Sequence, residues 1–164
     1  RMMLGGKYQS TRVIMQESID KFNIVKLAVG IKDIEILINR QISNGLLYSN
    51  DNHLLKMCFT TRNTPKLINE IIDSDEGSIY WVIAGKIALR QKIIGSFNLE
   101  LKEQKKICVI GLSDKLFLTQ RIPKRPFQGW RYLKNNDTPR DIGLYSKGDV
   151  SNTVLEELDR LSLL

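Results

Sequence analysis

The chain has 164 residues, of which 42% are hydrophobic and 26% charged, a composition that favours one soluble domain with its own core. No apolar run reaches the roughly 20 residues of a membrane span, and one histidine with two cysteines leaves too few ligands for zinc. We therefore expect a cytoplasmic protein with reduced thiols, no metal, no cofactor and no membrane contact, whose net charge of +7 suits a polyanion or simply a basic solvated surface.

The opening of the chain predicts an extension followed by alternating strands and helices. Residues 1–20 show weak periodicity and no apolar stripe, so we expect them to be loosely ordered, with a single domain over residues 21–164. Residues 22–30 are typical of a buried first strand. Isoleucine and leucine then recur at helical spacing and predict a helix that begins near Asp33.

The next segments repeat this order. Residues 54–60 predict a second strand, and residues 63–73 a second helix with an apolar stripe. Thr64 is a suitable N-cap, and Pro65 suits the first helical position because its missing N–H costs nothing there. The first half of the chain therefore reads β-α-β-α.

The second half is typical of antiparallel strands. Residues 78–85 are apolar on both faces, as in a central strand. From Ile87 onward alternate residues are apolar, interrupted only by Gln91 and Gly95, which predicts a long half-buried strand bent at Gly95. Residues 107–112 then return as the second arm of a hairpin.

The remainder predicts one more strand, an irregular loop and a final helix. Residues 115–122 form the strand, and Pro123 with Pro126 prevents regular pairing beyond it. Residues 151–164 predict a C-terminal helix with a capping box. The fold class is α+β, with two to three helices packed on a curved mixed sheet.

Positive charge is concentrated in one segment and along one strand. Between Lys115 and Arg140 the chain has seven bases and one acid, and seven minus one gives +6. On the long strand Lys86, Arg90 and Lys92 share the polar parity, which predicts a row of cations spaced about 7 Å apart per two residues. Such a row suits a phosphate backbone, or an exposed sheet face beside acidic neighbours.

The stretch RPFQGWRYL, residues 125–133, mixes aromatic rings with arginines. Proline stiffens such a loop, which lowers the ordering cost of binding. Its rings suit base stacking, its arginines suit phosphates, and its glutamine suits a base edge, although rings that cap the core would give the same pattern. The candidate nucleic-acid or anion-binding residues are Arg62, Lys86, Arg90, Lys92, Lys124, Arg125, Phe127, Gln128, Trp130 and Arg131.

Catalytic templates are absent from the sequence. There is no G-x-S-x-G, no phosphate-binding glycine loop and no H-E-x-x-H motif. His53 lies in a turn-rich stretch that is typical of the surface. Catalytic residues are therefore not indicated, and whether the protein is an enzyme stays open.

Several quoted stretches together resemble a bacterial family catalogued as a domain of unknown function, whose pattern runs near GSLYWVIKG…RQ…RRPFQGWRYL…DAPPDL. The matching stretches here are GSIYWVIAG, RQKI, RPFQGWRYL and DTPRDI, with KLAVG and TRNTPK earlier in the chain. The resemblance spans about residues 24–143. Ala84 stands where the family has lysine, and Lys124 stands where it has arginine, which would remove a bidentate contact.

A shorter stretch, AGKIALRQKI, is similar to the glycine-basic strand of the PUA-like superfamily, which implies a small curved barrel that binds RNA or modified bases. On this resemblance the fold would be a PUA-like barrel in place of an open curved sheet. Both versions agree with a sheet that carries a basic, aromatic loop.

The leading hypothesis from the sequence is a nucleic-acid-binding domain, with RNA favoured over DNA. In this hypothesis the strand bases contact phosphates while Trp130 or Phe127 stacks a base. Arg125, Arg131 and Gln128 set position and selectivity.

Two alternatives stay open. One is a small enzyme acting on a nucleotide-like or other anionic substrate that Arg62, Lys86 and Arg90 hold beside Asp114 or Asp141. The other is a protein-interaction module that uses the aromatic loop. The oligomeric state is not indicated.

Overall fold

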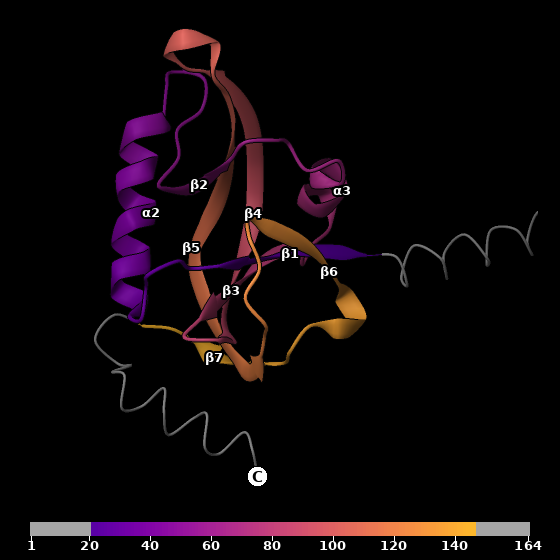
Figure 1. The fold of residues 1–164 in the computed structure, drawn as a ribbon. Coiled ribbons are helices and arrows are strands. Elements are labelled where there is room, and N and C mark those ends of the chain that lie inside the picture. The colour runs from indigo at the N-terminus through magenta and orange to yellow at the C-terminus, as the bar shows by residue number, and fades with distance from the viewer. Residues whose placement is uncertain (1–20, 147–164) are drawn as a thin grey trace, which may run out of the picture.

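Two helices and one mixed sheet of seven strands make up the computed structural model, which describes residues 21–146 (Figure 1). The predicted N-terminal extension, residues 1–20, and the predicted C-terminal helix, residues 151–164, lie outside the described residues. Within the described part, no helix is long and apolar enough to cross a membrane. The elements are β1 (Phe22–Leu27), α2 (Ile34–Tyr48), β2 (Met57–Thr61), α3 (Ile68–Asp73), β3 (Ser78–Ile83), β4 (Lys86–Glu100), η1 (Lys102–Gln104), β5 (Lys106–Pro123), β6 (Trp130–Lys134), η2 (Asn135–Asp137) and β7 (Asp141–Leu144).

The strands follow the order β2-β5-β4-β3-β1-β6, and β7 pairs with β5 beyond the end of β2. Only β1 and β3 run parallel, and every other pair of neighbours is antiparallel. β6 occupies one edge, β2 and β7 occupy the other, and the described sheet is not closed. The α+β class and the mixed sheet are thus confirmed, whereas a closed barrel is not formed.

The first half follows the predicted β-α-β-α order. Asp33 caps α2 as expected, because its carboxylate accepts a hydrogen bond of 3.0 Å from the backbone N–H of Glu35. The prediction for Thr64 was wrong. Its hydroxyl donates to the side chain of Asn98 at 2.7 Å, and α3 begins only at Ile68, after a turn. β2 also begins later than expected, at Met57.

The hairpin of β4 and β5 dominates the second half. β3 is fully buried, as predicted for a central strand. The register of β4 shifts between Ile93 and Gly95, the place where the sequence predicted a bend. Residues 107–112 and 115–122 belong to one strand of 18 residues, β5, and not to two. The sequence did not predict β6 or β7.

The sheet has two faces with different covers. On the face that α2 and α3 cover, which we call the helix-side face, Ile24 and Ile79 pack with Ile34 of α2 and Ile71 of α3. On the opposite face, which we call the loop-side face, a smaller cluster contains Val25, Tyr80, Val82, Ile87 and Leu133, with Phe127 packed against it. The loop before β6 therefore covers part of the face that neither α2 nor α3 covers.

A buried amide pair connects α2 to the sheet. Gln41 and Gln91 exchange two side-chain hydrogen bonds of 2.8 Å, and the indole N–H of Trp81 donates to the same Gln91 oxygen at 2.9 Å. The Gln91 amide nitrogen also donates to the carbonyl of Ser113 on β5 at 3.1 Å. Because both amides are almost fully buried, these bonds replace the water that burial removes.

Candidate nucleic-acid interface

A β-bulge in β4 changes which way its side chains point. Trp81 of β3 pairs with Leu89 of β4, but the next residue, Val82, pairs with Ile87. Ala88 is therefore the extra residue of the bulge, and it packs in the helix-side core together with Leu89. Side chains before the bulge consequently have the opposite parity from those after it.

The bulge separates the three bases of the predicted row. Lys86 pairs with Ile83, whose side chain belongs to the helix-side core. Arg90 pairs with Tyr80 on the loop-side face, and Lys92 lies two residues farther along on that same face. The prediction that these three bases share one strand face was therefore wrong, because alternation was counted through an irregular position.

Arg90 is held by internal partners. Its Nε and Nη2 donate to the two carboxylate oxygens of Asp141 at 2.9 and 2.7 Å, and Nη1 donates to the Ser78 hydroxyl at 3.0 Å. The guanidinium also lies 4.4 Å from the centre of the Phe117 ring. Hydrogen bonding to Asp141 also raises the pKa of Arg90. Because Nε, Nη1 and Nη2 all have internal partners, this cation anchors β7 and is not available to a phosphate.

A polar cavity of about 170 Å³ adjoins this pair, and Glu76, Tyr80, Thr138 and Pro139 contribute to its lining. Burial raises the pKa of Tyr80, while a side-chain hydrogen bond with Thr138 acts in the opposite direction. Residues 135–140 connect β6 at one edge with β7 at the other, and they cross the loop-side face, because Thr138 and Pro139 line this cavity together with Tyr80. The cavity lies beneath this crossing segment.

The stretch RPFQGWRYL is partly loop and partly strand. Residues 124–129 form the loop, and the backbone N–H of Lys124 ties its beginning to the carbonyl of Gly85 at 2.9 Å. Phe127 fastens its middle to the loop-side cluster. Gly129, at φ +71°, adopts the left-handed conformation that lets the chain enter β6. The loop is thus attached at its beginning, middle and end.

The aromatic rings of this stretch lie on opposite faces of the sheet. Phe127 packs in the loop-side cluster, whereas Trp130 and Tyr132 pack against the helix-side core. Trp130 contacts Tyr132 edge to face, with ring centres 4.9 Å apart, and the Tyr132 hydroxyl accepts a hydrogen bond from the backbone of Leu67. Phe127 and Trp130 therefore do not form a common stacking platform.

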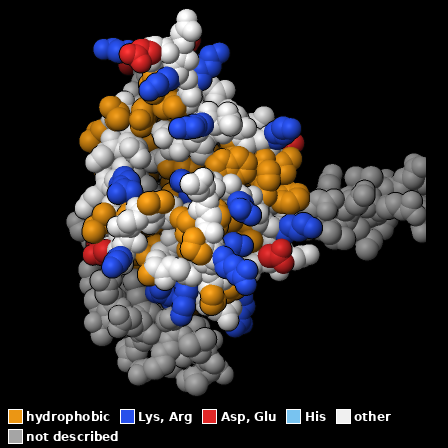
Figure 2. Space-filling view, viewed as in Figure 1, with side chains coloured by type: hydrophobic (Ala, Val, Ile, Leu, Met, Phe, Trp, Pro, Cys, Tyr) orange, Lys and Arg blue, Asp and Glu red, His pale blue; other side chains and the backbone are white. Residues whose placement is uncertain are grey.

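Arg131 completes the loop-side arrangement. Its guanidinium lies 5.3 Å from the centre of the Phe127 ring, and the side chains of Arg125, Gln128 and Arg131 are all exposed. Among residues 21–146, no carboxylate forms an ion pair with Lys124, Arg125 or Arg131. Figure 2 shows Lys and Arg side chains gathered on the lower part of the face in view, where Figure 1 places β7 and the segments on either side of β6.

Arg62 lies far from this loop. It lines a cavity of about 440 Å³ with Glu100 and Lys106, at the end of the sheet where β5 begins, whereas the loop follows the end of β5. Asp114 forms its ion pair with Lys56. The anion cradle of the enzyme hypothesis, which needed Arg62 beside Arg90, is consequently not assembled.

Residues 24–164 match the sequence model of a family described as "Protein of unknown function (DUF1489)". The chain belongs to this family. The expectation of a domain-of-unknown-function family is thereby confirmed. No curated protein and no solved structure matches the chain.

The DUF1489 match includes a lysine that sequence reasoning missed. Lys26 lies on β1, with Trp81 of β3 and Trp130 of β6 as its cross-strand partners on the helix-side face. It is half-buried, and burial lowers its pKa from the usual 10.5. The available signal was a single charged residue inside the apolar strand FNIVKL.

Proposed function

We propose that the protein binds single-stranded RNA through a basic loop surface, which consists of Lys124, Arg125, Gln128 and Arg131 supported by Phe127. The observation that carries this proposal is the charge of the attached loop: three bases without an ion pair to any described carboxylate. Exposed cations that are already positioned attract a polyanion and lose little conformational freedom when it binds.

The arrangement of Arg131 favours stacking as well as charge. A guanidinium that lies over an aromatic ring presents its other face to solvent, and nucleobases stack on such planes. Gln128 offers an amide donor and acceptor for a base edge. RNA with unstacked bases suits this short surface better than a duplex groove, which requires a helix or a ribbon.

Other candidate residues take smaller roles in this proposal. Lys92 lies on the same face of the sheet and adds to the positive potential there. Trp130, on the opposite face, does not stack the bound base.

The proposal predicts that Arg125→Ala and Arg131→Ala weaken RNA binding in different ways. Arg125→Ala removes one phosphate contact, which lowers the slope of log affinity against log salt by about 0.7. Arg131→Ala removes a stacking plane, which costs about 1–3 kcal/mol, or roughly 5- to 150-fold in affinity, with less effect on the slope. Fluorescence anisotropy of a labelled single-stranded RNA over a salt series measures both quantities.

Arg62→Ala is the matched control, because Arg62 is an exposed arginine in a different part of the sheet. We expect it to bind RNA like the unmodified protein. Equal losses in Arg62→Ala and Arg125→Ala would show that only overall charge matters and would contradict the proposed surface. No RNA binding at low salt would overturn the function itself.

A further inference from the structure

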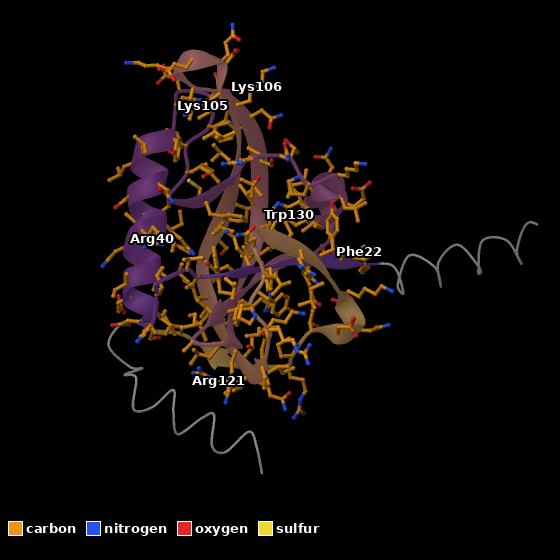
Figure 3. All side chains as sticks on the ribbon, in the orientation of Figure 1. Phe22, Arg40, Lys105, Lys106, Arg121 and Trp130 are labelled. Atoms are coloured by element: carbon orange, nitrogen blue, oxygen red, sulfur yellow. The ribbon has the colours of Figure 1, made fainter. Side chains whose placement is uncertain are left out.

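A second site lies on the helix-side face, between α2 and the sheet. It is a cavity of about 170 Å³, and the side chains that matter for binding are Lys26, Arg40, Asn44, Phe59 and Trp81. Among the described residues that line it, there is no aspartate or glutamate. Figure 3 places Arg40 on α2 and Trp130 at the beginning of β6.

Lys26 provides the charge of this cavity. It makes no hydrogen bond or ion pair with any residue in the range 21–146, although β1 holds it half-buried between Trp81 and Trp130. Cations removed from water are ordinarily paired with an anion, because desolvation disfavours the charged form. One negative charge from a ligand would supply the pairing that the described residues do not.

The walls of the cavity are flat and rigid. The rings of Phe59 and Trp81 meet edge to face, with centres 5.5 Å apart. The indole N–H of Trp81 is fixed by Gln91, which the buried amide of Gln41 holds in turn. These aromatic surfaces are therefore oriented before any ligand arrives.

We propose that this cavity binds a small, flat monocarboxylate, whose carboxylate pairs with Lys26 and whose apolar part packs against Phe59 and Trp81. The volume corresponds to roughly six water molecules at about 30 Å³ each, below the range of about 300–1,000 Å³ for drug-sized ligands. A single charge matches the single half-buried cation, whereas Arg40 is exposed at the rim and donates weakly to the carbonyl of Val29. The site is independent of the basic loop surface.

Benzoate is a direct probe, because the only two tryptophans of the chain are the cross-strand partners of Lys26. We expect benzoate to change tryptophan fluorescence saturably, and to do so in Trp130→Phe, where Trp81 alone reports. Benzamide, with the same shape and no charge, and acetate, with the charge and no ring, should each bind at least about tenfold more weakly.

Lys26→Met keeps the aliphatic stem and removes the charge, and Lys32→Met is the control, since Lys32 is exposed and does not line the cavity. We expect Lys26→Met to lose at least about tenfold in benzoate affinity and Lys32→Met to lose none. Affinity in the unmodified protein should fall as rising pH deprotonates Lys26, below the range of an exposed lysine.

Urea unfolding of Lys26→Met confirms that the variant is folded, and its RNA affinity should equal that of the unmodified protein. A folded Lys26→Met that binds benzoate as tightly as the unmodified protein would overturn the site. So would a fluorescence response that is absent, or equal for benzoate and benzamide.

Discussion

At the scale of single residues, burial determines the reactivity of the two cysteine thiols. Cys58 on β2 is fully buried, and burial raises the pKa of its thiol to about 11. Cys108 on β5, which pairs with Thr61 of β2, is also buried, with its sulfur 3.2 Å from the Ser96 hydroxyl. Thiolate is the reactive form, so a raised pKa and an inaccessible sulfur both suppress reaction.

We therefore predict that neither thiol reacts with Ellman's reagent in the native protein at pH 8. At a pKa of about 11, roughly one Cys58 thiol in a thousand is ionised at that pH, before inaccessibility is considered. Both thiols should react fully in concentrated guanidinium, which serves as the control. Rapid reaction of one thiol under native conditions would instead show that the β2 edge opens locally.

At the scale of elements, the amide pair of Gln41 and Gln91 connects α2, β3, β4 and β5. Gln91→Leu removes the acceptor of the Trp81 indole and both bonds to Gln41. Each buried polar group left without a partner costs about 1–3 kcal/mol, so we predict a loss of about 3 kcal/mol in the free energy of unfolding. Urea denaturation monitored by circular dichroism measures this loss.

The double variant Gln41→Leu with Gln91→Leu tests whether the stability loss of each single variant comes from leaving the other buried amide without its partner. Because it removes both amides together, it should lose less stability than the sum of the two single variants. Gln128→Leu is the control, since Gln128 is exposed and its loss should change stability by less than about 0.5 kcal/mol. Additive losses would show that the amides act independently.

The same elements show which features of the fold a local sequence pattern can predict and which it cannot. The alternation of apolar and polar residues from Ile87 onward predicted β4, and each of its two interruptions, at Gln91 and Gly95, corresponds to a structural feature. Gly95 lies beside a register shift, and a glycine in a strand is a local signal of such an irregularity. Gln91 pairs with a residue 50 positions away, and no local period can indicate such a partner. The bulge at Ala88 likewise depends on β3, so the row of cations was assigned to one face incorrectly.

At the scale of the whole molecule, the edges of the sheet were the hardest part to predict. β7 is short and exposed throughout, so it has neither the length nor the alternation that identifies a strand. β6 follows a proline-containing loop and was read as part of it. Its pairing with β1 sends Trp130 and Arg131 to opposite faces, and the aromatic loop consequently divides between two sites.

The ion pair of Arg90 and Asp141 holds the β7 edge of the sheet in place, because it joins the centre of the sheet to β7 across the loop-side face. Arg90 is only 14% exposed and Asp141 is 39% exposed, so removing the carboxylate leaves a largely buried cation unpaired. We predict that Asp141→Ala lowers the free energy of unfolding by about 2 kcal/mol, less than the roughly 3–5 kcal/mol for a fully buried pair.

The loss should be local as well as global. Amide hydrogen exchange should accelerate in residues 141–145, whose backbone bonds to β5 depend on this anchor, while exchange in the central β3 stays slow. Asp137→Ala is the matched control, since Asp137 is exposed and forms no ion pair with a described residue. If Asp141→Ala leaves exchange in β7 unchanged, then strand pairing alone holds the edge, and the ion pair does not anchor β7.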